Sequence, residues 1–315
     1  MRPFRFGVNV RSAASRSAWR DKARRIEALG YAVLTVPDHL TDLMAPLPAL
    51  VAAAEATVRL RVGTNVLNND LRHPVLVARE AATIDLLTDG RLELGLGAGS
   101  IRAEYDAAGL LFERGAARVD RLTEAVAVIK RLLAGERVDF AGRHYQVRGH
   151  AIAPLPMQKP HPPILVGGNG PRLLALAARE ADIVGFSGIG FRGGGALPPD
   201  LSGWRAAGVD ERVRLVRETA GADRLARLEF NVLLQRVVVT DDRRKAAGEL
   251  SELTGRWTQL SADEVLDSPF ALIGTAEEIV ADLVARRQRW GFSYYTVQEP
   301  YLDALAPAVA RLAGG

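Results

Sequence analysis

The segment from Arg61 to Ser100 contains two apolar strands that are joined by a single helix. The strands are predicted at Arg61–Val66 and Arg91–Gly97, and the helix is predicted to begin at His73–Pro74, because proline is tolerated at the first helical position. Parallel strands need a crossover connection of this kind, and near-continuous apolar strands are typical of a sheet covered on both faces. The segment therefore predicts one strand–helix–strand unit of a buried parallel sheet.

The same alternation repeats along the rest of the chain. Six further strands are predicted at Phe4–Val10, Tyr31–Val36, Pro163–Val166, Asp182–Phe186, Arg227–Gln235 and Tyr294–Val297. Apolar residues at helical spacing predict helices at Trp19–Gly30, Ala45–Thr57, Arg114–Ala134, Pro171–Glu180, Asp210–Ala220, Thr275–Trp290 and Tyr301–Leu312. Eight alternations within 315 residues favour a (β/α)₈ TIM barrel over a doubly wound sheet, formed as one domain over residues 1–315.

Two segments interrupt the alternation. Residues 136–153 alternate apolar and polar positions around Ala141–Gly142, which predicts a hairpin insertion. Residues 188–203 follow the sixth strand and are rich in glycine and proline. In a barrel such a loop lies over the mouth where ligands bind, so it is interpreted either as a mobile lid or as an ordinary surface loop.

The composition excludes several classes of protein. The chain has no cysteine, which excludes disulfides, thiolate metal sites and thiol catalysis. The first residues form a predicted strand and not a signal peptide, and no apolar stretch has membrane-spanning length, so a cytoplasmic protein is expected. The net charge is +4, but the arginines alternate with acids on helix faces and aromatic residues make up only 6%. A small-molecule substrate is therefore expected, and not a nucleic acid or a membrane.

Polar residues and glycines follow the predicted strands. The active sites of TIM barrels gather at the carboxyl ends of the strands. These ends provide one histidine, several hydrogen-bonding side chains and much bare backbone: Asn9, Asp38–His39, Asn65–Val66, Gly97–Ser100, Gly167–Gly170, Ser187–Gly188 and Gln298–Glu299. This set favours a site that holds a cofactor through main-chain groups over acid–base hydrolysis.

Two of these strand ends indicate particular chemistry. His39 places an imidazole at the mouth, where it can transfer a proton near neutral pH, although it could instead cap the following loop. The turn Gly167–Gly170 precedes a predicted helix, whose free N–H groups favour a phosphate. A plain tight turn is the alternative there.

Other site types fit the sequence poorly. The segment Gly95–Gly99 reads GxGxG and follows the fourth strand, so it does not match the dinucleotide fingerprint of a Rossmann fold. The five histidines lack metal-ligand spacing, and no metal site is predicted. A nucleophile elbow of the form GxSxG is absent, which argues against a serine hydrolase.

Four motifs, in order, resemble the bacterial luciferase-like monooxygenase family. They are VPDH (36–39), VGTNVLNNDLRHP (62–74), DGRLELGLGAGS (89–100) and PMQKPHPPILVGGNGPRLLALAAREAD (156–182). The resemblance extends from Phe6 to the C-terminal helix. It implies a TIM barrel that uses FMN or the deazaflavin coenzyme F420, and the spacing and arginine-rich composition are closer to the F420-dependent branch.

The resemblance also implies roles for individual residues. His39 would be catalytic, and the bond between Asn65 and Val66 would be a non-prolyl cis peptide that backs the central ring of the cofactor. The residues implied to bind the cofactor are Asp38, Asn65, Val66, Ala98, Gly99, Ser100, Gly167, Gly168, Asn169, Gly170, Ser187 and Gly188. Those expected to contact the substrate are Asn9, Ile189 and Phe191.

The chain departs from the F420-dependent sugar phosphate dehydrogenases at two positions. Ser100 stands where they carry a catalytic glutamate, and Glu104, one helical turn further on, is not assigned that role. The segment Ser187–Gly190 has no lysine where they place one that binds phosphate. An uncharged or apolar substrate is therefore expected in place of a sugar phosphate.

The resulting prediction is an oxidoreductase that transfers a hydride between F420 and such a substrate, with His39 moving the accompanying proton. One alternative is an FMN-dependent monooxygenase that uses O₂ and a partner reductase. A second is a non-catalytic protein that binds F420 or a flavin, and a third is a barrel hydrolase without a cofactor. Apolar residues surround much of the helix His73–Leu87, which predicts a homodimer.

Overall fold

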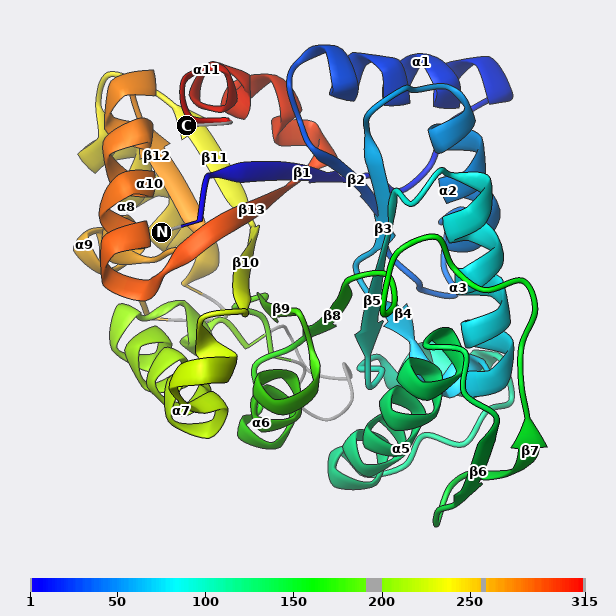
Figure 1. Ribbon diagram of the computed structural model, residues 1–315. Coiled ribbons are helices and arrows are strands. Elements are labelled where there is room, and N and C mark those ends of the chain that lie inside the picture. Colours follow the sequence, from blue (N-terminus) through cyan, green and yellow to red (C-terminus); the bar gives the residue numbers. More distant parts are fainter. Residues whose placement is uncertain (1, 191–199, 256–258, 314–315) are drawn as a thin grey trace.

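The computed structural model describes residues 2–190, 200–255 and 259–313. Parallel strands form a closed ring in this part of the chain, in which β3 pairs with both β2 and β5 (Figure 1). The strands of the ring, in spatial order, are β3 (Arg61–Thr64), β2 (Val33–Val36), β1 (Arg5–Asn9), β13 (Phe292–Gln298), β10 (Glu229–Leu234), β9 (Ile183–Phe186), β8 (Ile164–Gly167) and β5 (Leu92–Gly97). The predicted eight-stranded TIM barrel is therefore confirmed.

Helices surround this ring, as Figure 1 shows. They are α1 (Arg16–Ala28), α2 (Pro46–Glu55), α3 (Pro74–Leu87), α5 (Gly115–Leu133), α6 (Pro171–Glu180), α7 (Ala206–Leu225), α10 (Ala276–Trp290) and α11 (Leu302–Leu312). Short 3₁₀ turns lie at Asn69–Leu71, Ser202–Trp204 and Glu299–Tyr301. No helix in the described residues is both long and apolar enough to cross a membrane.

Local sequence signals explain where several helices begin and end. Pro74 opens α3, and the ring of His73 accepts a hydrogen bond from the first turn of that helix. Helix α10 begins with a capping box in which Thr275 and Glu278 bind each other's backbone N–H groups. The same helix ends at Gly291, whose φ of +86° suits glycine.

Some elements differ from the prediction. Helix α7 begins before Asp210 and ends after Ala220, with a break at Gly221. Between β10 and β13 the chain forms β11 (Arg236–Val239), α8 (Arg243–Thr254), α9 (Ala262–Asp267) and β12 (Ala271–Gly274), none of which was predicted. Within the part of the chain that the structure describes, strands β11 and β12 pair only with each other, outside the ring, so they add no alternation to the barrel.

Two further segments lie beside the ring. Strands β6 (Val138–Ala141) and β7 (Gln146–His150) form an antiparallel hairpin at the periphery of the molecule (Figure 1). Of the glycine-rich loop, residues 191–199 lie outside the described residues, and they include the predicted substrate contact Phe191. At the base of this loop Gly190 and Asp200 form an antiparallel bridge.

A cluster of charged side chains fills the end of the barrel where the strands begin. Arg5 lies between two carboxylates, with its guanidinium 2.5 Å from Glu93 and 2.6 Å from Glu229. Arg61 adds a third pairing, 2.8 Å from Glu93, and the ring of Tyr294 lies 4.0 Å from the Arg5 guanidinium. Burial by itself would raise the pKa of Glu93, but Arg5 and Arg61 outweigh it and hold that pKa below its ordinary value.

The substitution Glu93→Gln is expected to lower the free energy of unfolding by about 3 kcal/mol at neutral pH, because it removes one of the two carboxylates paired with the partly buried Arg5 and the carboxylate paired with Arg61. The stabilisation by Glu93 is complete above the unfolded pKa of about 4.3 and is lost as the pH falls through the lower folded pKa. In urea unfolding, the difference in the free energy of unfolding between Glu93→Gln and the wild type should therefore become smaller below about pH 4.3.

A matched control removes a carboxylate from the half-exposed Lys130–Glu180 pair. The substitution Glu180→Gln is expected to change the free energy of unfolding by about 0.5 kcal/mol or less. An equal loss of stability in both variants would show that the cluster at Glu93 stabilises the fold no more than a half-exposed ion pair does.

Candidate active site

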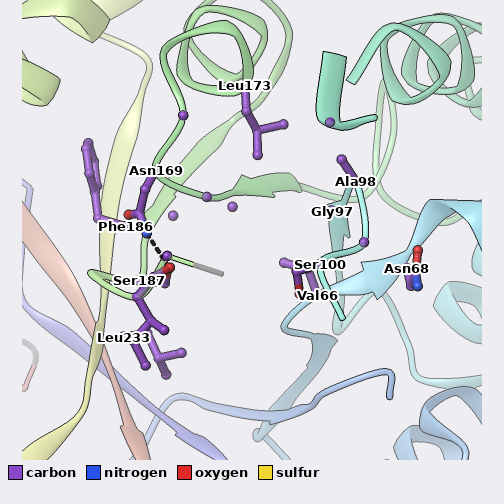
Figure 2. A pocket seen from close by; sticks show the side chains of 18 of the residues that line it. Val66, Asn68, Gly97, Ala98, Ser100, Asn169, Leu173, Phe186, Ser187 and Leu233 are labelled. Carbon is purple, nitrogen blue, oxygen red and sulfur yellow. Dashed lines mark hydrogen bonds between the residues drawn. The ribbon is translucent and has the colours of Figure 1, made fainter. Parts of the chain in front are cut away.

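A cavity of about 640 Å³ opens at the carboxyl ends of the barrel strands. Figure 2 shows two facing walls, with Val66 and Ser100 on one side and Ser187 and Leu233 on the other. The wall residues are Asp38, His39, Asn65, Val66, Asn68, Gly97–Ser100, Glu104, Gly115, Ala116, Arg118, Val119, Gly167–Leu173, Gly185–Ser187, Ile189, Gly190, Asn231, Leu233, Gln235 and Gln298. This volume suits a cofactor or drug-sized ligand.

A one-residue bulge forms part of the first wall. Strand β3 pairs with β5 up to Gly63, and the pairing resumes through β4 (Leu67–Asn68). The chain takes four steps from Gly63 to Leu67, whereas β5 takes three between their partners. The extra residue bends the strand, and the Asn65–Val66 bond within it is cis, as the resemblance implied.

The neighbouring strands make room for Val66 with glycines. A Cβ at Gly97 would overlap Cγ2 of Val66, and one at Gly167 would lie 3.2 Å from Cγ1. The side chain of Val66 is thus held between β5 and β8, on the cavity wall. The glycines therefore set how far the bulge can sit into the barrel.

The turn after β5 also requires glycine. Gly99 has φ of +72°, and a Cβ there would overlap the hydroxyl of Tyr105. That hydroxyl lies 3.0 Å from Oδ1 of Asn68 and 3.1 Å from Oδ2 of Asp70. These contacts hold the Gly99–Ser100 turn against the β4 segment, so that its backbone lines the cavity.

His39 is joined to a carboxylate that the sequence did not assign. Its Nδ1 lies 2.9 Å from Oε1 of Glu104, and the N–H of Leu40 donates to Oε2 at 3.2 Å. The carboxylate can only accept, so Nδ1 carries the proton and Nε2 is the ring nitrogen left for a ligand. Glu104 is buried in α4 (Arg102–Ala107), whereas the His39 side chain is 37% exposed.

Asp38 has other hydrogen-bond partners than this pair. Its Oδ2 accepts from the N–H of Asn68 at 2.9 Å and from Arg72 at 2.6 Å. The carboxylate therefore ties the β2 end to the segment after the bulge. Although Asp38 lies on the cavity wall, its charge is balanced by Arg72.

The far end of the cavity is formed by the first residues of two helices. Helices α5 and α6 both begin there without a capping side chain. Within the described residues, no hydrogen bond uses the N–H of Asn169, Gly170, Arg172 or Leu173. The N–H of Gly168, in contrast, donates to Gly185. Free N–H groups at two helix N-termini favour an anion.

The side chain of Asn169 is already engaged. Its Nδ2 donates to Oγ of Ser187 at 3.1 Å, drawn as a dashed line in Figure 2, and to the carbonyl of Ile189 at 2.7 Å. Its Oδ1 accepts from the N–H of Gly188 and from Arg212, each at 3.2 Å. Asn169 thus joins the turn after β8 to the turn after β9, and only its backbone is free for a ligand.

The wall formed by the ends of β9, β10 and β13 has a different character. It presents apolar side chains and amides: Phe186, Ile189, Asn231, Leu233, Gln235 and Gln298. No described residue of this wall carries a charge. Asn9 and Gly188 are not among the residues that line the cavity. Asn9 donates a hydrogen bond to Gln298, which does line it, at 3.3 Å.

The structure thus brings most of the predicted site residues to one cavity. The sequence reasoning placed Gln298 at a strand end but missed Glu104, the start of α5, and the amides Asn231 and Gln235 as wall residues. Glu104 had a readable signal, since it lies one helical turn after the glycine turn. The amides had none, because side chains inside a barrel are brought together only by its closure.

The chain is similar in sequence to known proteins. A model of the luciferase-like monooxygenase family matches residues 1–294. F420-dependent glucose-6-phosphate dehydrogenases of Microbacterium testaceum and Beutenbergia cavernae are 35% and 40% identical. The alignments cover 57% and 50% of this chain and 55% and 48% of those relatives, so the chain matches about half of their length.

A solved structure shows the same fold over almost the whole chain. The coenzyme F420-dependent tetrahydromethanopterin reductase from Methanopyrus kandleri superposes with a TM-score of 0.76. It covers 98% of each chain at 17% identity. The fold and the cavity define a TIM barrel with a cofactor-sized site. The chain belongs to the luciferase-like monooxygenase family, which confirms the resemblance seen in the sequence.

The substitution Gly97→Ala is expected to lower the free energy of unfolding by about 1–3 kcal/mol, because the new Cβ would overlap Val66. Adding Val66→Ala should recover most of this loss by removing the overlapping methyl groups. Thermal and urea unfolding measure both effects.

The control Gly115→Ala lies on the same cavity, where a Cβ meets no atom closer than 4.0 Å. It is expected to leave stability unchanged or to raise it by up to about 1 kcal/mol. If Gly97→Ala were as stable as this control, the glycines of β5 and β8 would not be what holds Val66 in place.

Proposed function

We propose that this protein is an oxidoreductase that transfers a hydride between coenzyme F420 and an uncharged or apolar organic substrate. One observation carries the proposal. A single cavity combines a main-chain cradle, an anion-binding end, and a histidine whose Nδ1 is held by a buried glutamate. The curated relatives, which are named F420-dependent dehydrogenases, support the same cofactor.

The residues present fit the proposed cofactor. Val66 and the Gly97–Ser100 turn offer a surface of backbone and small side chains for a flat ring system. The free N–H groups at Asn169–Leu173 would hold the phosphate, with Arg118 and Arg172 nearby on the wall. When bound, F420 would accept or donate the hydride at its ring carbon.

His39 is proposed as the group that moves the proton. Nε2 would take a proton from an alcohol, or return one to a carbonyl, as the hydride is transferred. Glu104 keeps the proton on Nδ1 and would stabilise the imidazolium that forms. The contact of Glu104 with Nδ1 also limits the orientations that the imidazole ring can adopt, and so the directions in which Nε2 can act.

The substrate is proposed to lie against the β9, β10 and β13 ends. This wall offers apolar side chains and amides, and no charge among its described residues. A phosphorylated sugar would leave its dianion without a cation there, at a large cost in desolvation. This chain is therefore proposed to differ in substrate from the glucose-6-phosphate dehydrogenases that it resembles.

We also propose that the chain acts as one domain, 1–315, and as a homodimer in the cytoplasm. Leu76, Leu86 and Leu87 of α3 are between 43% and 54% exposed. An apolar helix face of this kind is suited to cover the same face of a second copy.

Fluorescence titration of the purified protein with F420 and with FMN tests the cofactor. Micromolar binding of F420 with at least tenfold weaker binding of FMN is expected. A preference for FMN would favour an oxygen-using monooxygenase with a partner reductase, and binding of neither would contradict the proposal. Neutral alcohols such as cyclohexanol should then reduce bound F420, whereas glucose 6-phosphate should not.

The substitution His39→Ala is expected to lower kcat by roughly 10²- to 10⁴-fold, because proton transfer loses its catalyst. Glu104→Ala should lower kcat by roughly 10- to 100-fold, because the imidazole loses its orienting partner. The Kd for F420 should stay within about threefold in both variants, since neither side chain is proposed to hold the cofactor.

Asp106→Ala is the matched control, since Asp106 is an exposed carboxylate on the same helix as Glu104. Its kcat should equal that of the wild type. An unchanged kcat in His39→Ala would remove His39 from the mechanism, whatever the effect at Glu104.

A further inference from the structure

Arg212 lies behind the cavity, on α7, and its guanidinium is held by three oxygen atoms. Nε donates to the carbonyl of Gly208 at 2.9 Å, Nη1 donates to Oδ1 of Asn169 at 3.2 Å, and Nη2 donates to the carbonyl of Gly203. All three acceptors are uncharged. The cation is therefore well hydrogen-bonded but is not neutralised by these contacts.

No carboxylate of the described residues forms an ion pair with Arg212 within 4.0 Å, although other partly buried arginines have one, as Arg72 does with Asp38. The undescribed segments 191–199 and 256–258 contain no aspartate or glutamate. Burial lowers the pKa of Arg212, and exposed Glu211 opposes this shift. A partly buried charge without a counter-ion is unfavourable, so an anion nearby would stabilise it.

One side chain separates this charge from the cavity. Asn169 accepts from Arg212 through its side chain, and Asn169 and Gly170, whose N–H groups form no hydrogen bond within the described residues, line the cavity. The aromatic ring of Phe270 lies 5.9 Å from the guanidinium. The guanidinium is therefore partly shielded from bulk water, beside residues that line the cavity.

We propose that Arg212 is a specificity-determining residue, whose charge acts through Asn169 as the counter-ion of the cofactor's phosphate. The inference rests on the proposed function only in placing a phosphate at the Asn169–Leu173 N–H groups. Arg212 does not touch the ligand. It raises the affinity for a phosphorylated chromophore over the same chromophore without phosphate.

A purely structural role makes a different prediction. If Arg212 only joined α7 to the Asn169 turn, its loss would distort the turn and weaken both forms of the chromophore alike. The ratio of the two dissociation constants separates charge from shape, because the two ligands differ only in the phosphate.

The experiment measures Kd for two ligand pairs, 8-hydroxy-5-deazariboflavin with its 5′-phosphate, and riboflavin with FMN. In Arg212→Gln the phosphorylated member of the pair that binds should be weakened about tenfold at low salt, as expected for a charge several ångströms away. The member without phosphate should stay within twofold. Arg212→Lys keeps the charge and should retain the wild-type ratio within threefold.

The matched control is Arg214→Gln, an exposed arginine on the same helix that pairs with Glu218 at 3.1 Å. It should leave both constants within twofold. If Arg212→Gln does not fold, the two dissociation constants of Arg212→Lys decide, because a lost structural clamp would weaken both ligands alike, whereas a retained charge would leave both within about threefold of the wild type. Equal weakening of both ligands in either variant would overturn the role of Arg212.

The outcomes separate this inference from the proposed function. Binding of the riboflavin pair in place of the deazaflavin pair would contradict F420 as the cofactor, and Arg212 would then be tested on FMN. Binding of neither pair by the wild type would overturn both proposals.

Discussion

The segment that joins β3 to β4 has one residue more than the part of β5 that it lies beside, and this extra residue shapes the site of this protein. The ring has to close between β3 and β5, and the closure is regular only near the start of these strands. The extra residue pushes Val66 into the barrel mouth, and glycines on β5 and β8 accept it. The cradle of the site therefore results from how the barrel closes.

The charged side chains at the two ends of the barrel differ in whether they have partners of opposite charge. Where the strands begin, Arg5 and Arg61 neutralise Glu93 and Glu229 within the ring, which supports stability alone. At the mouth, Asp38 is also neutralised, but helix N-termini and Arg212 leave an unbalanced positive end. Such an arrangement favours an anionic ligand.

Much of the fold could be predicted from the sequence, because strand–helix alternation is a local pattern. The eight ring strands follow the predicted order, and the cis bond lies at Asn65–Val66 as the resemblance implied. The β11–β12 insertion was missed, because its short strands pair outside the ring. Among site residues, His39 was found from its place at a strand end, whereas its partner Glu104 was not assigned.

The sequence by itself determined the barrel, the position of the strand ends and the glycines that keep them bare. These features depend on apolar periodicity and on residues close together in the chain. Only the tertiary structure decided which polar groups meet: Glu104 with His39, Arg72 with Asp38, and Arg212 with Asn169. Such pairs join residues between 34 and 65 positions apart, and their contact depends on ring closure and helix packing, which no local pattern encodes.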